Sequence, residues 1–225
     1  MRESFLPFCP PCLGEEEIAE VVDALRSGWI TTGPKTKLLE EEFCQYVQAP
    51  AGVAVSSGTA ALHLGLEVAG LGPGDEVITT AHTFIATANA IEHTGARPVL
   101  VDIEPDTLNI DPERVAAAIT PRTRGLVPVH YAGHPVELDP LRELAHTHDL
   151  VLLEDAAHAV AAAYKGQLIG QCDNPVAWSF YATKNMTSAE GGMLTGQPDY
   201  IEQARIASLH GMSKEAWKRY GKGGS

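Results

Sequence analysis

The stretch Leu150-Val-Leu-Leu-Glu-Asp-Ala-Ala-His158 decides the fold class of this chain. Its first four residues form a continuous apolar run, which is typical of a strand buried on both faces of a parallel sheet. Asp155 and His158 follow where that strand ends. Since open parallel sheets bind ligands at the carboxyl ends of their strands, the same stretch also indicates the edge where a site would lie.

Strand-like and helical patterns alternate on both sides of this stretch. Strands are predicted over 52–55, 76–80, 98–103, 125–130, 150–154, 165–169, 176–180 and 192–195. Helices are predicted over 15–27, 35–47, 59–69, 84–93, 112–119, 139–148 and 198–210. Repeated strand–helix–strand units with short connections predict a three-layer α/β fold, in which helices cover both faces of a mainly parallel sheet.

The composition excludes several classes of function. The 225 residues include 16 Lys and Arg against 29 Asp and Glu, so the net charge is −13. This acid excess argues against a nucleic-acid partner or an anionic membrane surface, because both require clustered basic residues. No run approaches the roughly 18 apolar residues of a membrane span, and the proline-broken N-terminus does not resemble a secretory signal. We therefore expect a cytoplasmic protein.

The four cysteines are too few and too scattered for a disulfide scaffold. Cys9-Pro-Pro-Cys12 has the spacing of a redox or zinc pair. However, no second pair follows at a suitable distance, and the segment is a proline-rich leader rather than part of a strand–helix unit. No metal site is expected.

A first candidate site is Ser57-Gly58-Thr59, which lies between a predicted strand and a predicted helix. Free N–H groups and the dipole at a helix N-terminus favour a phosphate. The alternative interpretation is an ordinary helix cap, since serine and threonine are preferred at that position.

A second candidate is Asp155. A carboxylate at the end of a buried strand is costly unless it meets a cation or strong donors. The alternative is a helix cap for the residues that follow. His158 would lie about one helical turn further along, on the same side.

A third candidate is Lys184, which sits among small and apolar residues just after a predicted strand. A desolvated lysine has a lowered pKa and becomes a nucleophile for carbonyl groups. The alternative is a lysine in an exposed loop. The other six lysines occur in polar contexts: Lys35, Lys37, Lys165, Lys214, Lys218 and Lys222.

These three features at one sheet edge are what pyridoxal phosphate requires. A lysine forms the Schiff base, a cradle holds the phosphate, and an acid keeps the pyridine nitrogen protonated. A flat side chain must also cover the ring, and Phe84, which follows the predicted strand 76–80, is suitably placed. The residues themselves therefore predict a pyridoxal-phosphate site.

The sequence also resembles the DegT-type sugar aminotransferases, which are fold-type I pyridoxal-phosphate enzymes acting on nucleotide-linked keto sugars. The matching segments, spread over nearly the whole chain in the family order, are 26–34, 56–62, 74–77, 83–89, 128–133, 154–159 and 179–192. Ala161 departs from the glycine that relatives commonly carry. Relatives also continue well beyond Ser225, so a small C-terminal domain is expected to be missing here.

The resemblance implies a role for each matching residue. Lys184 would be the catalytic Schiff-base lysine, and Asp155 would pair with the pyridine nitrogen. The implied cofactor-binding residues are Ser57, Gly58, Thr59, Phe84, Asp155, His158, Ser179 and Lys184. Trp29 and Thr31, together with Ser57, would line the side of the active site that binds the sugar.

The resemblance also implies a domain organisation and an activity. Residues 1–50 would form a helical segment beside the site, 51–212 the large cofactor-binding domain, and 213–225 a loop-like truncated end. The implied reaction moves an amino group from glutamate to a nucleotide-linked keto sugar, most similar to UDP-4-keto sugars, for polysaccharide, lipopolysaccharide or glycolipid synthesis. A homodimer with shared active sites is expected. The alternatives are an accessory or regulatory binding protein without turnover, and another fold-type I enzyme such as a desulfurase.

Overall fold

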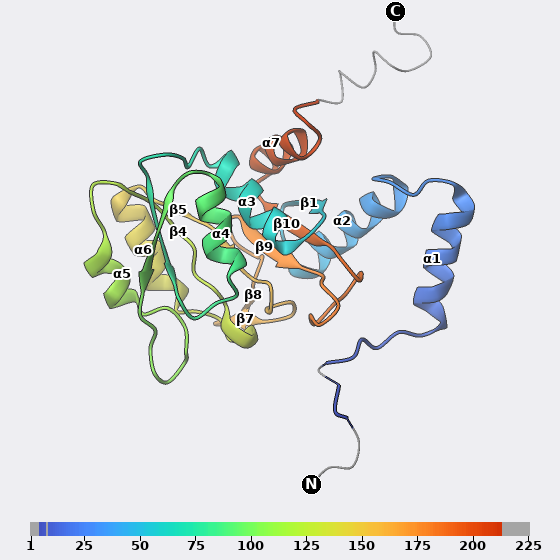
Figure 1. Ribbon diagram of the computed structural model, residues 1–225, viewed down its shortest axis with the longest axis horizontal. Coiled ribbons are helices and arrows are strands. Elements are labelled where there is room, and N and C mark those ends of the chain that lie inside the picture. Colours follow the sequence, from blue (N-terminus) through green and yellow to red (C-terminus); the bar gives the residue numbers. More distant parts are fainter. Residues whose placement is uncertain (1–4, 8, 213–225) are drawn as a thin grey trace, which may run out of the picture.

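The computed structural model describes residues 5–7 and 9–212 of the chain (Figure 1). Its helices are α1 Glu15–Ser27, α2 Pro34–Val47, α3 Gly58–Val68, α4 Ala86–His93, α5 Pro112–Ala118, α6 Leu138–His148 and α7 Pro198–Ser208, with a short 3₁₀ helix η1 Tyr131–Gly133. Its strands are β1 Ala51–Val55, β2 Glu76–Thr80, β3 Arg97–Val101, β4 Thr123–Leu126, β5 Val151–Leu152, β6 Glu154–Asp155, β7 Ala163–Tyr164, β8 Gln167–Leu168, β9 Val176–Ser179 and β10 Gly192–Gly196.

Two strand ladders join into one mixed sheet. One ladder has the order β1-β10-β9-β6 and the other β3-β2-β4-β5. β5 and β6 are consecutive along the chain and are separated only by Leu153, whose N–H donates to the carbonyl of Leu126 at 3.0 Å. Neighbouring strands are parallel except around β10, which runs antiparallel to both β1 and β9. The predicted mainly parallel sheet is confirmed.

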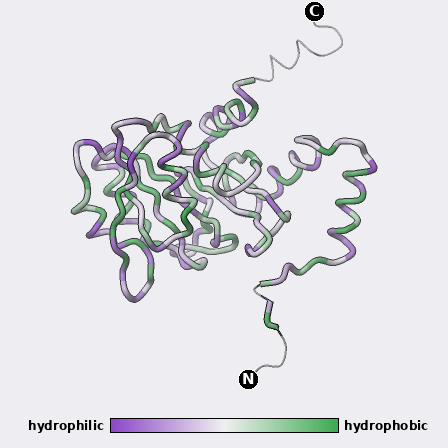
Figure 2. The backbone as a smooth tube through the Cα atoms, viewed as in Figure 1, coloured by the Kyte–Doolittle hydropathy of each residue, from purple (hydrophilic) through white to green (hydrophobic). Residues whose placement is uncertain are grey.

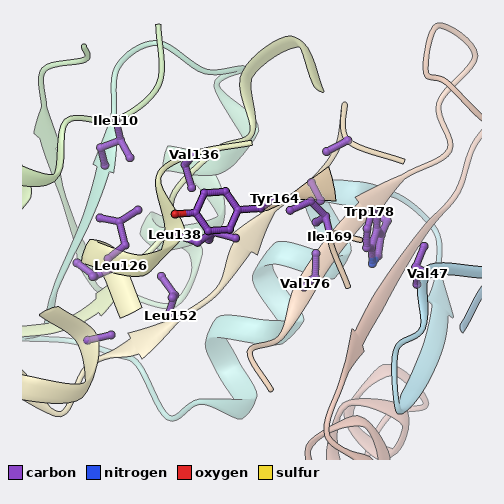
Figure 3. Packing of buried hydrophobic residues seen from close by; sticks show 14 of the residues in the cluster. Val47, Ile110, Leu126, Val136, Leu138, Leu152, Tyr164, Ile169, Val176 and Trp178 are labelled. Carbon is purple, nitrogen blue, oxygen red and sulfur yellow. The ribbon is translucent and has the colours of Figure 1, made fainter. Parts of the chain in front are cut away.

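Each face of the sheet has its own apolar core, because successive strand residues point to opposite faces. Val176 and Trp178 belong to one buried cluster with α2, α5 and α6, and Figure 3 shows their packing. Ala177 belongs to the other cluster, with α3, α4 and α7. The predicted three-layer arrangement is therefore confirmed.

The two N-terminal helices differ in how they relate to this core. α2 buries Phe43 and Val47 against the sheet. α1 stands apart from the body (Figure 1) and buries none of its residues. Its apolar side chains Ile18, Val21 and Leu25 are exposed, and Figure 2 shows hydrophobic stretches along this isolated helix.

The prediction was wrong over 165–169, which was expected to be a single strand. The chain there reverses direction between β7 and β8, which pair as an antiparallel hairpin. Lys165 and Gly166 occupy the turn with φ of 49° and 85°, as a two-residue primed turn requires. The remaining predicted helices and strands are present with boundaries that differ by a few residues.

Two further expectations concern the rest of the chain. The predicted loop-like end over 213–225 lies outside the described residues. Within the described part, no helix has the length and apolarity needed to cross a bilayer.

Candidate functional site

A cavity of about 450 Å³ opens at the edge of the sheet predicted to carry the site. Every residue predicted to bind the cofactor lines it, and these residues come from segments that adjoin four different strands. Its lining includes Ser57, Gly58, Thr59, Thr83, Phe84, Thr87, Val129, Tyr131, Asp155, His158, Ser179, Tyr181, Thr183, Lys184 and Glu190. The fold thus brings the three candidate segments together.

The first wall of the cavity is the N-terminus of α3. Ser57 caps the helix, since its hydroxyl accepts a hydrogen bond from the N–H of Ala60 at 3.1 Å. The N–H groups of Gly58 and Thr59 have no acceptor among the described residues. The helix therefore offers free donors to an anion. The structure confirms the cap, and the anion site stays a prediction.

Two glycines allow this wall to pack tightly. A Cβ on Gly58 would lie 2.8 Å from the Cβ of Ser179, at the end of β9. A Cβ on Gly192 would lie 2.4 Å from the carbonyl carbon of Ser57. Both distances are too short for real side chains. The turn at Ser57 can reach β9 and β10 only because these positions carry no side chain.

Asp155 forms the floor of the cavity and is 5% exposed. Its carboxylate accepts hydrogen bonds from the hydroxyl of Thr87 at 2.8 Å and from the N–H of Ala157 at 3.1 Å. The Thr87 hydroxyl in turn lies 2.7 Å from that of Thr83. Among the described residues, no basic side chain lies within 4.0 Å of this carboxylate. The floor is therefore a buried acid that is oriented by donors but lacks a paired cation.

Lys184 and His158 line the same cavity as this acid. Lys184 is partly buried, and burial lowers its pKa, while the negative charge of Asp155 partly opposes the shift. Burial also lowers the pKa of His158, with a further contribution from the positive charge of Lys184. A lysine with a lowered pKa carries more neutral amine at a given pH, which is the form that attacks a carbonyl group.

The remaining predicted residues divide into two groups. Phe84 lies at the rim of the cavity and is 73% exposed. Trp29 and Thr31 do not line the cavity of their own chain. The indole N–H of Trp29 donates to the carbonyl of Thr32 at 3.0 Å, and Thr31 lines a separate hollow that shares Glu190 with the cavity.

Sequence reasoning missed the residues that orient Asp155. Thr83 and Thr87 are four residues apart, at the entry to α4 and within it, so their side chains lie on one face. That spacing, next to Phe84, was the available signal. Tyr131, on η1, was missed because nothing in its local pattern distinguishes it from a structural tyrosine.

The cysteines and possible metal ligands lie outside this arrangement. Cys9 and Cys12 are free and exposed, and the Cys9 thiol lies 3.5 Å from the carbonyl of Thr183. Within the described residues, no group of three or more His, Cys, Asp and Glu side chains could hold a metal ion.

Comparison with known proteins places this geometry in context. The DegT/DnrJ/EryC1/StrS aminotransferase family matches residues 11–224. The chain is 52% identical over 225 residues to the spore coat polysaccharide biosynthesis protein SpsC of Bacillus subtilis (strain 168), and this match covers 100% of the chain and 58% of SpsC. The chain thus spans a little more than half the length of the curated relatives it matches.

Solved structures that resemble this chain include sugar aminotransferases. The putative sugar aminotransferase Spr1654 from Streptococcus pneumoniae, in its PMP form, matches with a TM-score of 0.89 and 43% identity, over 94% of this chain and 59% of Spr1654. DesI, solved in the presence of its TDP-sugar product, matches with a TM-score of 0.87 and 36% identity, over 96% of this chain and 55% of DesI.

Proposed function

Because the chain belongs to the DegT/DnrJ/EryC1/StrS aminotransferase family, we propose that it binds pyridoxal phosphate and transfers an amino group from glutamate to a nucleotide-linked keto sugar. One observation carries the proposal. A lysine with a lowered pKa, a buried acid without a paired cation and a helix N-terminus with free N–H groups line the same cavity of about 450 Å³.

The residues present fit the cofactor. The N–H groups of Gly58 and Thr59, with the hydroxyl of Ser179, would hold the phosphate, and the missing Cβ of Gly58 lets Ser179 approach the helix N-terminus closely enough to share in that role. Asp155 would hold the protonated ring nitrogen, and Phe84 would cover the ring face. When bound, pyridoxal phosphate supplies an electron sink for negative charge that develops on the carbon bearing the transferred nitrogen.

The chain itself would supply proton transfer and orientation. Nζ of Lys184, which is partly buried, would accept a proton from the glutamate carbon that gives up the nitrogen in one half of the reaction, and would donate a proton to the sugar carbon that receives the nitrogen in the other half. The hydroxyl of Thr87 donates to one oxygen of Asp155 and would keep the carboxylate oriented for the ring nitrogen. His158, with its lowered pKa, would stay neutral near pH 7 and hydrogen-bond the ring hydroxyl.

The proposed substrates rest on the relatives. SpsC is named for spore coat polysaccharide biosynthesis, and DesI was solved with a TDP-sugar product. These names support a sugar product that enters polysaccharide synthesis; an amino sugar for lipopolysaccharide or glycolipid is the proposal that the sequence resemblance adds. Because the protein carries a net charge of −13, the anionic sugar nucleotide would depend on local donors at the cavity mouth. Trp29 and Thr31 would line the sugar side.

We also propose a cytoplasmic homodimer whose subunits share active sites. α1 projects from the body and exposes Ile18, Val21 and Leu25, and a second copy would cover this apolar stripe. Trp29 and Thr31 follow α1 and do not line their own cavity, so a partner subunit could use them. Sedimentation should give a dimer for the wild type and a monomer for Val21→Glu.

The function is tested by trapping the cofactor. Pyridoxal phosphate is added to the chain, borohydride reduces any Schiff base, and peptide mass spectrometry locates the adduct. We expect one adduct at Lys184, none in Lys184→Ala, and an unchanged yield in Lys37→Ala, whose lysine is exposed on α2. A wild-type chain that traps no cofactor, or traps it at another lysine, would contradict the proposal. Amino transfer from glutamate to a keto sugar by the same chain separates an enzyme from a binding protein without turnover.

A further inference from the structure

A buried polar cluster lies behind the cavity, on the opposite face of the sheet. Its centre is the pair His130 and Glu154, whose residues are both 0% exposed. Nε2 of His130 lies 3.0 Å from Oε2 of Glu154. The other carboxylate oxygen accepts a hydrogen bond from the amide of Asn174 at 3.1 Å, and a guanidinium nitrogen of Arg142 lies 3.8 Å away.

The hydrogen bonds determine the protonation of this pair. The N–H of Val136 donates to Nδ1 of His130 at 3.2 Å, so that nitrogen carries a lone pair and no proton. Nε2 of His130 therefore carries a proton and donates it to Glu154. Burial alone would raise the pKa of Glu154, but the hydrogen bonds that it accepts from His130 and Asn174, together with nearby positive charge, outweigh burial and lower it. The pair is an imidazole that donates a hydrogen bond to a buried carboxylate.

The pair links two strand ends that carry cavity residues. His130 lies between Val129 and Tyr131, which both line the cavity, and Glu154 immediately precedes Asp155. The backbone N–H of His130 donates to the carbonyl of Asp155 at 3.0 Å, and the N–H of Asp155 donates to the carbonyl of Pro128 at 2.9 Å. The side-chain bond therefore reinforces the last rung between these strands.

The cavity spans this rung. On one side lie β9, β10 and β1, which lead to Ser179 and Ser57 at the anion-binding wall. On the other side lies β2, which leads to Phe84 and Thr87. Asp155 is at the rung itself. A change in the separation of the two strands would move the acid relative to Lys184 and to the anion-binding wall.

We propose that His130 and Glu154 are positioning residues that fix this separation and thereby hold Asp155 in register with Lys184. The inference rests on the proposed function, because Asp155 matters through the cofactor it would hold. Burying a carboxylate in an otherwise apolar core is costly even when it is paired, and apolar residues of similar volume commonly stabilise such a core equally well. A directional hydrogen bond instead specifies one strand spacing.

The test measures pyridoxal-phosphate affinity in His130→Gln, Glu154→Gln and the double variant, by titrating the visible absorbance of the bound cofactor. We expect each single variant to bind about tenfold more weakly, by misplacement of the acid. The double variant should be no weaker than the weaker single variant, because both remove the same bond. The matched control is Glu76→Gln, a buried carboxylate at the opposite sheet edge, whose affinity should equal that of the wild type.

Two further measurements do not depend on turnover. In the cofactor-free chain, the amide protons of His130 and Asp155 should exchange faster in both single variants, while those of β3 should not change. In the loaded chain, the pH midpoint of the cofactor absorbance should shift in these variants and not in Glu76→Gln. A purely structural role would lower the melting temperature and leave both signals of the folded protein unchanged.

The outcomes separate this inference from the proposed function. If the wild type binds no cofactor, the proposed function fails, and amide exchange still decides whether the pair holds the rung. If the wild type binds and both variants bind equally well, the inference is overturned. Should both variants fail to fold, Asn174→Ala replaces them. This change removes a half-buried donor to Glu154, and we expect a smaller loss of affinity; unchanged affinity would overturn the inference.

Discussion

The two edges of the sheet each bury a carboxylate, but in opposite electrostatic settings. Glu76, at the start of β2, is 1% exposed and accepts hydrogen bonds from Arg97 at 2.5 Å, Thr120 at 2.7 Å and Arg122 at 2.8 Å. These bonds lower its pKa to about 2. Asp155, at the other edge, accepts bonds only from a hydroxyl and a backbone N–H among the described residues.

This difference distinguishes an acid with structural partners from the acid that we propose to be functional. A buried carboxylate that pairs with two arginines has its charge balanced by the protein itself, and it stabilises the fold. A buried carboxylate oriented by neutral donors, and facing a cavity, is poised for a cation that the described chain does not place beside it. The second arrangement lowers the stability of the protein without ligand, because a buried charge has no paired cation, and it becomes favourable only when a cationic ligand binds.

The largest effect should follow from Asp155→Asn. The affinity for pyridoxal phosphate should fall on the order of 100-fold, because the ring nitrogen loses its buried counter-charge. Without cofactor, the variant should be at least as resistant to urea as the wild type, since an unpaired buried charge has been removed. Cofactor titration and urea unfolding check both statements. Undiminished affinity would remove Asp155 from the site.

Glu76→Gln should show the opposite pattern, with unchanged cofactor affinity and a melting temperature several degrees lower. The pKa of Glu76 is about 2 in the folded chain, against 4.5 as its ordinary value. Its stabilising contribution is therefore present above pH 4.5 and is lost as the pH falls toward 2. Urea unfolding at pH 6 and pH 3 gives the free energy of unfolding at each pH. This free energy should change less between the two pH values in Glu76→Gln than in the wild type. An equal change in both proteins would contradict the assignment.

The lysines should show the same contrast in their reactivity. Glu20 and Asp23 raise the pKa of the exposed Lys35 to about 12, whereas burial lowers that of Lys184 below 10.5. Competitive acetylation followed by peptide mass spectrometry should therefore label Lys184 at lower pH than Lys35. In Asp155→Asn, the pKa of Lys184 should fall further, because the opposing negative charge is gone. If Lys184 and Lys35 were acetylated over the same pH range, the prediction would be wrong.

The smallest effect is expected for His158→Gln. The pKa of His158 lies below its ordinary 6.5, so the imidazole is neutral near pH 7, as glutamine is. Cofactor affinity at pH 7 should change only a few fold. As the pH falls and His158 becomes protonated beside Lys184, wild-type binding should weaken, whereas His158→Gln should keep its affinity. Parallel titrations of both proteins from pH 8 to about 5 check this; identical pH profiles would exclude His158 as the titrating group.

The sequence predicted the layers and most of the cavity because those depend on local pattern. The apolar run before Asp155 and the small-residue turn at Ser57 each show their role within a few residues. Long-range pairings leave no such mark. Nothing in 192–196 indicates that β10 runs antiparallel, and Thr87 meets Asp155 only after α4 has folded over the sheet.

One other error had a local cause, and one had a long-range cause. The hairpin at Lys165 and Gly166 was missed because a short apolar run resembles one strand, although the glycine at a turn position was visible. The roles of His130 and Glu154 were missed because each residue is unremarkable alone, and only the folded sheet brings their side chains to 3.0 Å.

The antiparallel insertion of β10 between β1 and β9 also affects the order of assembly during synthesis. β1 is near the start of the sheet in sequence, yet its pairing partner lies close to the end of the described chain. At about 5–20 residues per second, a ribosome would take many seconds to deliver that partner. Until then β1 has an open edge and the turn at Ser57 lacks Gly192, the residue that packs against its backbone. A nascent chain should therefore acquire its ligand pocket abruptly, after β10 emerges, and depend on chaperone protection before that moment.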